Sequence, residues 1–167
     1  KGELEACDII DWPAFRMRGL MLGLGDTFVP MDELKKQIRL LSQYKVNALH
    51  LHLTDREAWR LGSQRYPQLT DPKHTAILPG KYYSPADLEE LARLCQEHRI
   101  TLIPELDLAE ASTLFSRAMG FDMHSPQGKR VLKELLTELS ERLDVPYIHL
   151  VTDEASPKDP QFTSELV

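Results

Sequence analysis

Acidic and histidine side chains recur at the ends of apolar segments in this chain of 167 residues. Three pairs of them are spaced two or four residues apart, so in an extended strand the members of each pair share one face. These pairs are His50 with His52, Glu105 with Asp107, and His149 with Asp153. Ionisable groups gathered on one face are costly to bury unless they are paired, and such clusters are typical of functional sites. With Asp55 and Glu154, the candidate site residues are His50, His52, Asp55, Glu105, Asp107, His149, Asp153 and Glu154.

The adjacent acids Asp153 and Glu154 follow the apolar run that ends at Val151. Glycoside hydrolysis needs a carboxylic acid that protonates the leaving oxygen and a second group that stabilises an oxocarbenium-like centre. Neighbouring carboxylates on an extended chain point in different directions, which suits two roles on one substrate better than a shared proton. The pair therefore favours carbohydrate cleavage.

The elements that must position these residues alternate between two periodicities. Apolar segments predict strands, and helical spacing of apolar residues predicts helices between them. Ser84-Pro85 and Ser125-Pro126 have the residue types that begin helices. The expected strands are Met17–Leu22, Val46–Leu53, Ile100–Asp107 and Tyr147–Val151, and the first helix is Met31–Tyr44.

Strands that alternate with helices predict an α/β fold with a parallel sheet and right-handed crossovers. Four strands form either a small open sheet or half of a closed (β/α)8 barrel, which takes about 250 residues. In both cases ligands bind at the carboxyl ends of the strands, where the acids and histidines lie. A half barrel also exposes two sheet edges that something must cover. The long connection from Thr54 to Tyr83 is of the kind that is usually functional or disordered.

Composition narrows the classes of function. Lys and Arg total 20 against 26 Asp and Glu, a net charge of −6, which argues against a nucleic-acid partner. No run approaches the roughly 18 apolar residues of a membrane helix, so no membrane segment is expected. Cys7 and Cys95 are too few for a disulfide framework, and Cys95 is expected to be a buried, inert thiol. Residues 1–11 are too polar for a signal peptide, but a processed secreted protein would look the same, so the compartment stays unknown.

Several motifs follow one another along the chain: DWPAFRMRGLML (11–22), YKVNALHLHLTD (44–55), Trp59-Arg60, YPQL (66–69), YSPADL (83–88), ITLIPELD (100–107), and His149 followed by Asp153-Glu154. In this order they resemble the catalytic domain of glycoside hydrolase family 20, the β-N-acetylhexosaminidases. The resemblance covers about residues 8 to 155.

The resemblance implies a TIM barrel of which about four βα units are present. Residues 1–15 would then be a lead-in from a preceding region, 16–155 the N-terminal half of the barrel, and 156–167 a tail. It implies an N-acetylhexosamine-containing glycan as substrate, no metal or other cofactor, and a possible homodimer through the exposed sheet edges. Members of the family are often secreted, periplasmic or lysosomal.

The resemblance also implies a substrate-assisted retaining mechanism without a protein nucleophile. Glu154 would be the general acid/base, and Asp153 would orient the acetamido nitrogen. Asp55 would belong to the sugar-binding network. The remaining candidates would support substrate binding: His50, His52, Glu105, Asp107 and His149.

Four positions depart from the family pattern. Gly23 stands where the family has Asp, and Asp26 stands where it has the Arg that grips the sugar hydroxyls. Ala109-Glu110-Ala111 replaces Pro-Gly-His, and Val151-Thr152 replaces small residues. Exchanging Arg for Asp replaces a five-donor fork with an acceptor, which weakens the usual sugar subsite.

Three alternatives follow from the residues. A degenerate half barrel that binds glycans or has a structural role is favoured by Asp26 and Ala111. A metal-dependent hydrolase would use His50, His52 and Asp55 as zinc ligands. A dinucleotide site at Gly23 and Gly25 is disfavoured because Phe28 holds the third glycine position.

Overall fold

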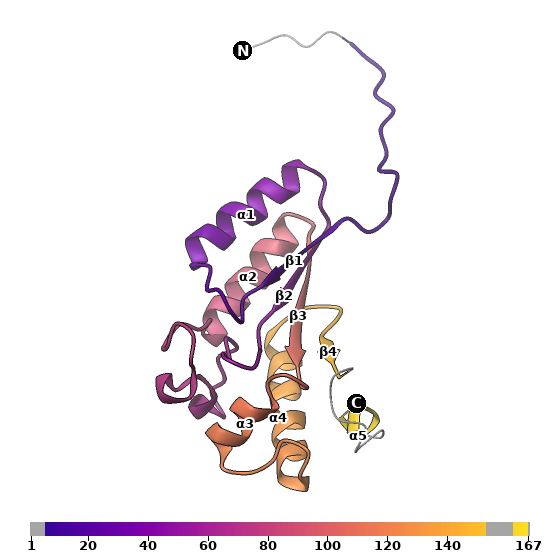
Figure 1. Cartoon of the computed structure of the whole chain (residues 1–167). Coiled ribbons are helices and arrows are strands. Elements are labelled where there is room, and N and C mark those ends of the chain that lie inside the picture. Colours follow the sequence, from indigo (N-terminus) through magenta and orange to yellow (C-terminus); the bar gives the residue numbers. More distant parts are fainter. Residues whose placement is uncertain (1–5, 153–161, 167) are drawn as a thin grey trace.

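Four parallel strands form one sheet in the computed structural model, which describes residues 6–152 and 162–166 (Figure 1). The strands are β1 (Gly19–Gly23), β2 (Ala48–His52), β3 (Thr101–Asp107) and β4 (His149–Val151). Each strand pairs in parallel with the next one along the chain, so the spatial order is β1-β2-β3-β4. The predicted parallel α/β sheet is confirmed.

Helices lie between the strands and after the last of them. They are α1 (Met31–Gln43), α2 (Pro85–Glu97), α3 (Ser112–Met119), α4 (Pro126–Arg142) and α5 (Phe162–Leu166), with short 3-10 helices η1 (Pro67–Thr70) and η2 (Pro72–His74). Two serines begin helices as predicted. Ser84 forms a reciprocal capping box with Asp87 at the start of α2, and the Ser125 hydroxyl accepts from the Gly128 N–H at the start of α4.

The sequence analysis did not predict α3 and α5. The residue before α3 is Ala111, which offers no side-chain cap, so the usual start signal is missing. Tertiary packing defines this helix instead, because Leu114 and Phe115 are fully buried. The short α5 places Phe162 and Leu166 in the core, and it packs against α4.

The hydrophobic core lies between the sheet and the helices on one of its faces. Alternate residues of β2 and its end, Leu49, Leu51 and Leu53, are fully buried. Leu34 of α1 and Leu91 of α2 belong to the same core, and Figure 1 shows both helices along one side of the sheet. Burial of this face leaves the other face of each strand for the polar residues, as the alternation predicted.

Cys95 is buried in the core, as predicted, and burial raises the pKa of its thiol to about 12. The thiol is therefore protonated and inert at neutral pH.

Within residues 6–152 and 162–166, the opposite face and both edges of the sheet are open. Met21 of β1 is 51% exposed, and no described strand pairs with the outer side of β1 or β4. A closed barrel would have no such edges. Residues 6–17, which precede β1, are exposed and extend away from the body (Figure 1). Within the described ranges, no helix has the length and apolar character needed to cross a membrane.

Candidate active site

The strand register brings four residues into one row at the carboxyl end of the sheet. Gly23 pairs with His52, His52 with Glu105, and Glu105 with His149. Side chains in one row of a parallel sheet point to the same face. The row therefore carries His52, Glu105 and His149 on the open face, next to the loops that follow the strands.

Glu105 is the centre of this cluster and is only 2% exposed. Its Oε1 contacts Nδ1 of His52. Its Oε2 lies 2.5 Å from Nε2 of His50 and 2.5 Å from Nδ1 of His149. Burial alone would raise the pKa of Glu105, but hydrogen bonds from His52 and His149 outweigh it, so the pKa is lowered. Glu105 is thus an ionised, buried carboxylate in contact with three imidazoles.

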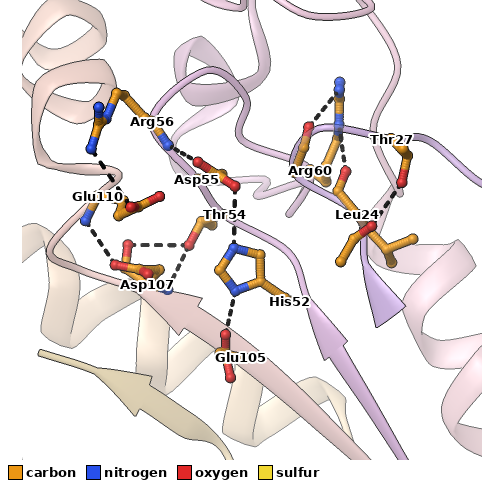
Figure 2. Close-up of polar contacts among 12 residues, drawn as sticks. Leu24, Thr27, His52, Thr54, Asp55, Arg56, Arg60, Glu105, Asp107 and Glu110 are labelled. Carbon is orange, nitrogen blue, oxygen red and sulfur yellow. Dashed lines mark hydrogen bonds and ion pairs between the residues drawn. The ribbon is translucent and has the colours of Figure 1, made fainter. Parts of the chain in front are cut away.

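His52 connects this buried carboxylate to Asp55 (Figure 2). Its Nε2 lies 3.4 Å from Asp55 Oδ2, on the side of the ring opposite Glu105. Burial lowers the pKa of His52, but the two carboxylates more than compensate, so the net shift is upward. Asp55 also accepts a hydrogen bond of 2.5 Å from the Arg56 N–H through Oδ1.

Asp107 shapes the loop after β3. Its backbone N–H donates to the Thr54 hydroxyl at 2.7 Å, and its Oδ1 accepts from the N–H groups of Ala109 and Glu110 at 2.9 and 2.7 Å. Burial raises the pKa of Asp107 in spite of these two backbone hydrogen bonds. These hydrogen bonds hold the carboxylate in the turn, and the turn places Glu110 next to Asp55.

Glu110 belongs to the site, although the sequence analysis noted it only as part of a departure from the family pattern. Hydrogen bonding with the Asp55 carboxyl, and to a lesser degree burial, raises the pKa of Glu110. Its Oε1 lies 3.6 Å from an Nη of Arg56, and Figure 2 shows these three side chains close together. The sequence signal was an acid that follows a strand end, but the contact depends on the turn that Asp107 forms.

The loop after β1 closes the other side of Asp55. A Cβ added at Gly25 would lie 2.4 Å from Asp55 Cβ, so only glycine fits there with Asp55 in its present position. Arg60 holds this loop against the long connection. Its guanidinium is buried, which lowers its pKa, and it donates to the backbone carbonyls of Leu24, Gly25, Ile77, Leu78 and Lys81.

A metal ion was one alternative, and the structure gathers a different set from the predicted one. His50, Glu105 and His149 have ligand atoms within 4.8 Å of one another. Two atoms that bind one tetrahedral Zn²⁺ lie about 3.3 Å apart. His50 Nε2 and His149 Nδ1 lie 3.3 Å apart, but Glu105 Oε2 lies 2.5 Å from each of these nitrogens, which is closer than two ligands of one zinc ion. The arrangement thus fits mutual hydrogen bonding, and both nitrogens of His52 already face carboxylates.

The structure therefore brings together His50, His52, Asp55, Glu105 and His149, with Asp107 behind the adjoining turn. Asp153 and Glu154 lie outside the described residues. The strand that precedes them is placed, because β4 ends at Val151 next to Asp107 of β3.

Comparison with known proteins gives consistent results. The sequence pattern described as "Glycosyl hydrolase family 20, catalytic domain" matches residues 15–114. The chain is 28% identical to a β-N-acetylhexosaminidase of Cellulomonas fimi over 98% of its own length and 38% of that protein. It is 34% identical to a β-hexosaminidase of Vibrio furnissii over 66% of its length and 20% of that protein. The chain thus spans between a fifth and two fifths of these relatives.

Solved structures agree on the fold. The exo-β-N-acetylglucosaminidase of Vibrio harveyi, in complex with N-acetylglucosamine, superposes with a TM-score of 0.78 at 26% identity, over 87% of this chain and 28% of that one. Another family 20 β-N-acetylglucosaminidase gives a TM-score of 0.79 at 25% identity, over 94% and 40%. The parallel sheet is part of the TIM barrel of this family, which confirms the predicted fold class. The chain belongs to glycosyl hydrolase family 20, and its matched residues are part of the catalytic domain of that family.

Proposed function

We propose that the complete protein is a glycoside hydrolase that removes terminal N-acetylhexosamine from glycans. The observation that carries this proposal is the Glu105–His52–Asp55 cluster at the carboxyl end of the sheet, in a chain that belongs to family 20. In barrel enzymes this edge is where substrates bind. The Vibrio harveyi neighbour was solved in complex with N-acetylglucosamine, which supports the same class of sugar here.

The proposed reaction is substrate-assisted and retaining. The carbonyl oxygen of the 2-acetamido group attacks the anomeric carbon as the bond to the leaving oxygen breaks, and Glu154 gives that oxygen a proton. Asp153 holds the acetamido N–H during this step. A water molecule then attacks the anomeric carbon of the oxazolinium, Glu154 takes its proton, and the acetamido group is restored. Two inversions give net retention without a protein nucleophile.

The described residues would bind and support the sugar in this proposal. The side chain of Asp55 is 17% exposed and would accept hydrogen bonds from sugar hydroxyls. His50 and His149, with side chains 23% and 50% exposed, can reach a ligand directly. Glu105 and Asp107 are buried and paired, so they would act through their neighbours.

A glycan-binding protein without turnover is the second candidate, and two observations favour it. Asp26 is exposed and carries a carboxylate where the family resemblance leads us to expect an arginine. Ala111 is fully buried where a histidine is expected, so it offers no hydrogen bond. Both changes remove donors that would hold the sugar.

Hydrolysis of 4-nitrophenyl N-acetyl-β-D-glucosaminide by the complete protein tests the two candidates. The glycosidase proposal expects turnover that Glu154→Gln abolishes and that Asp144→Asn, at a residue in the loop before β4, leaves unchanged. Binding of N-acetylglucosamine without turnover would favour the second candidate. Absence of both would overturn the proposed function. The 167-residue chain alone is expected to show little turnover, because it spans only between a fifth and two fifths of the relatives that it matches.

A further inference from the structure

His52 has a carboxylate oxygen at each of its ring nitrogens. Nδ1 contacts Oε1 of Glu105 on β3, and Nε2 lies 3.4 Å from Oδ2 of Asp55 in the loop after β2 (Figure 2). The side chain of His52 is only 14% exposed, so water does not readily take the place of either partner. The ring thus connects the buried carboxylate of Glu105 to the partly exposed carboxylate of Asp55.

This geometry determines how many protons the ring carries. A neutral imidazole has one N–H donor and one acceptor nitrogen, whereas an ionised carboxylate only accepts. In the neutral form, one nitrogen lone pair would face a carboxylate lone pair across the contact. The imidazolium form donates to both carboxylates and compensates their charge in a site of low polarity. The upward pKa shift of His52 has the same direction.

The other charged groups around His52 do not reverse this conclusion. Glu105 is shared with His50 of β2 and His149 of β4, so three rings compete for one carboxylate. Among the residues that the structure describes, His52 is the one of these three rings that also contacts a second carboxylate. Asp107 of β3 adds negative charge near the ring. Beyond Asp55 lie Arg56 and Glu110, which also contact each other.

Asp55 is held from several sides. His52 faces its Oδ2, the Arg56 N–H binds its Oδ1, and Gly25 leaves no free space beside its Cβ. Ala111, where the family pattern has a histidine, supplies no polar group to this arrangement. We propose that His52 is a positioning residue: as an imidazolium between Glu105 and Asp55, it fixes the orientation of the Asp55 carboxylate for the sugar. The proposal rests on the proposed function of the site.

NMR spectroscopy tests the charge of the ring without any substrate. Two-bond ¹H–¹⁵N correlations of the histidine-labelled 167-residue protein report which ring nitrogens carry protons, and through-bond experiments assign His52 in the wild-type protein. At pH 7, above the ordinary value of 6.5 for histidine, we expect both nitrogens of His52 to be protonated. A ring protonated on only one nitrogen at that pH would overturn the proposal.

Kinetics of the complete protein test the positioning role. We expect His52→Gln to lower kcat/KM for the aryl glucosaminide by up to about 100-fold, the cost of a misplaced site group. We also expect it to remove the alkaline limb of the pH profile that follows the NMR titration of His52. His98→Gln, at the opposite end of the sheet, is the matched control. A His52→Gln variant with the wild-type rate and pH profile would contradict the positioning role. If the wild-type protein shows no turnover, the proposed function fails, while the NMR result still decides the state of His52.

Discussion

The side chain of Asp55 is confined by its neighbours, and the position next to it has room for the hydrogen atom of a glycine but not for a Cβ. Gly25 packs against this side chain, whereas the sheet around Gly23 is open and an added Cβ there would have no neighbour within 4 Å. The two glycines lie two residues apart in the same segment. Alanine substitutions at these two positions therefore separate the effect of displacing Asp55 from the general effect of a larger side chain.

We predict that Gly25→Ala displaces Asp55 and lowers kcat/KM of the complete protein by at least about 10-fold, since small displacements of site groups are costly. Gly23→Ala is the control and should keep the wild-type rate within about twofold. Equal rates for the two variants would show that the position of Asp55 does not matter for catalysis.

The paired groups of the site also make stability depend on pH. The pKa of His52 is raised, so its contribution is fully present below 6.5 and is lost as pH rises through its folded-state pKa. The pKa of Glu105 is lowered, so its contribution is present above 4.5 and is lost as pH falls through its folded-state pKa. The cluster is therefore expected to stabilise the fold most between about pH 4.5 and 6.5.

We predict that the difference in free energy of unfolding between wild type and His52→Gln shrinks as pH rises from 6 to 9. Urea denaturation at a series of pH values measures it, with His98→Gln as the comparison. A difference that stays constant or grows over this range would contradict the assigned direction of the His52 shift.

At the scale of elements, helix starts are encoded locally. Ser84 and Asp87 satisfy each other's backbone N–H groups at the start of α2. We predict that Ser84→Ala destabilises the protein by about 1 kcal/mol, the usual effect of losing an N-cap. Ser140→Ala, on the exposed surface of α4, should change stability by less than about 0.5 kcal/mol. Thermal or urea unfolding checks both, and equal losses would refute a specific role of the cap.

Local signals of this kind explain how far the sequence could be interpreted. The strands and the helices α1, α2 and α4 were predictable because apolar periodicity and the Ser-Pro starts lie within each segment. The conformation of the long connection between β2 and α2 was not predictable. It depends on Arg60, which donates to backbone carbonyls as distant in the sequence as that of Leu24. The Glu110–Asp55 contact was hidden for the same reason, since it joins two loops through the turn at Asp107.

The sequence predicted which of the described candidate side chains share one face of the sheet, whereas Asp153 and Glu154 lie outside the described residues. Alternation placed His52 and Glu105 on one face, and parallel pairing placed their strand ends together. Which atom faces which could not be predicted, because the strand register and the side-chain rotamers determine that His52 reaches both Glu105 and Asp55. The sequence therefore indicated which side chains share this face, and the structure added the contacts between them.

At the scale of the whole molecule, both edges of the sheet are open in the described ranges. On β1, Leu20 and Met21 are exposed. Beside β4, a groove of about 410 Å³ is lined by apolar residues that include Leu136, Ile148 and Leu150. Unpaired parallel edges next to apolar surface favour pairing with another strand.

We propose that two copies of the 167-residue chain associate, with β1 of each next to β4 of the other. Sedimentation velocity should then show a concentration-dependent dimer, and Met21→Lys should shift it to monomer. Leu78→Lys is the control, because it places the same charge at an exposed apolar residue in the long connection. It should leave the dimer intact. A strict monomer for the wild-type chain at all concentrations would contradict the proposal.

The central claim is that the carboxyl end of the sheet is the sugar-binding edge. Titration of the ¹⁵N-labelled complete protein with N-acetylglucosamine, followed by NMR, tests it directly. We predict that amide shifts concentrate at Gly25, Asp55, Glu110 and Val151, whereas Lys45 and Arg99 at the opposite ends of the strands do not move. Shifts that centre on the opposite ends, or no shifts at saturating sugar, would contradict the account.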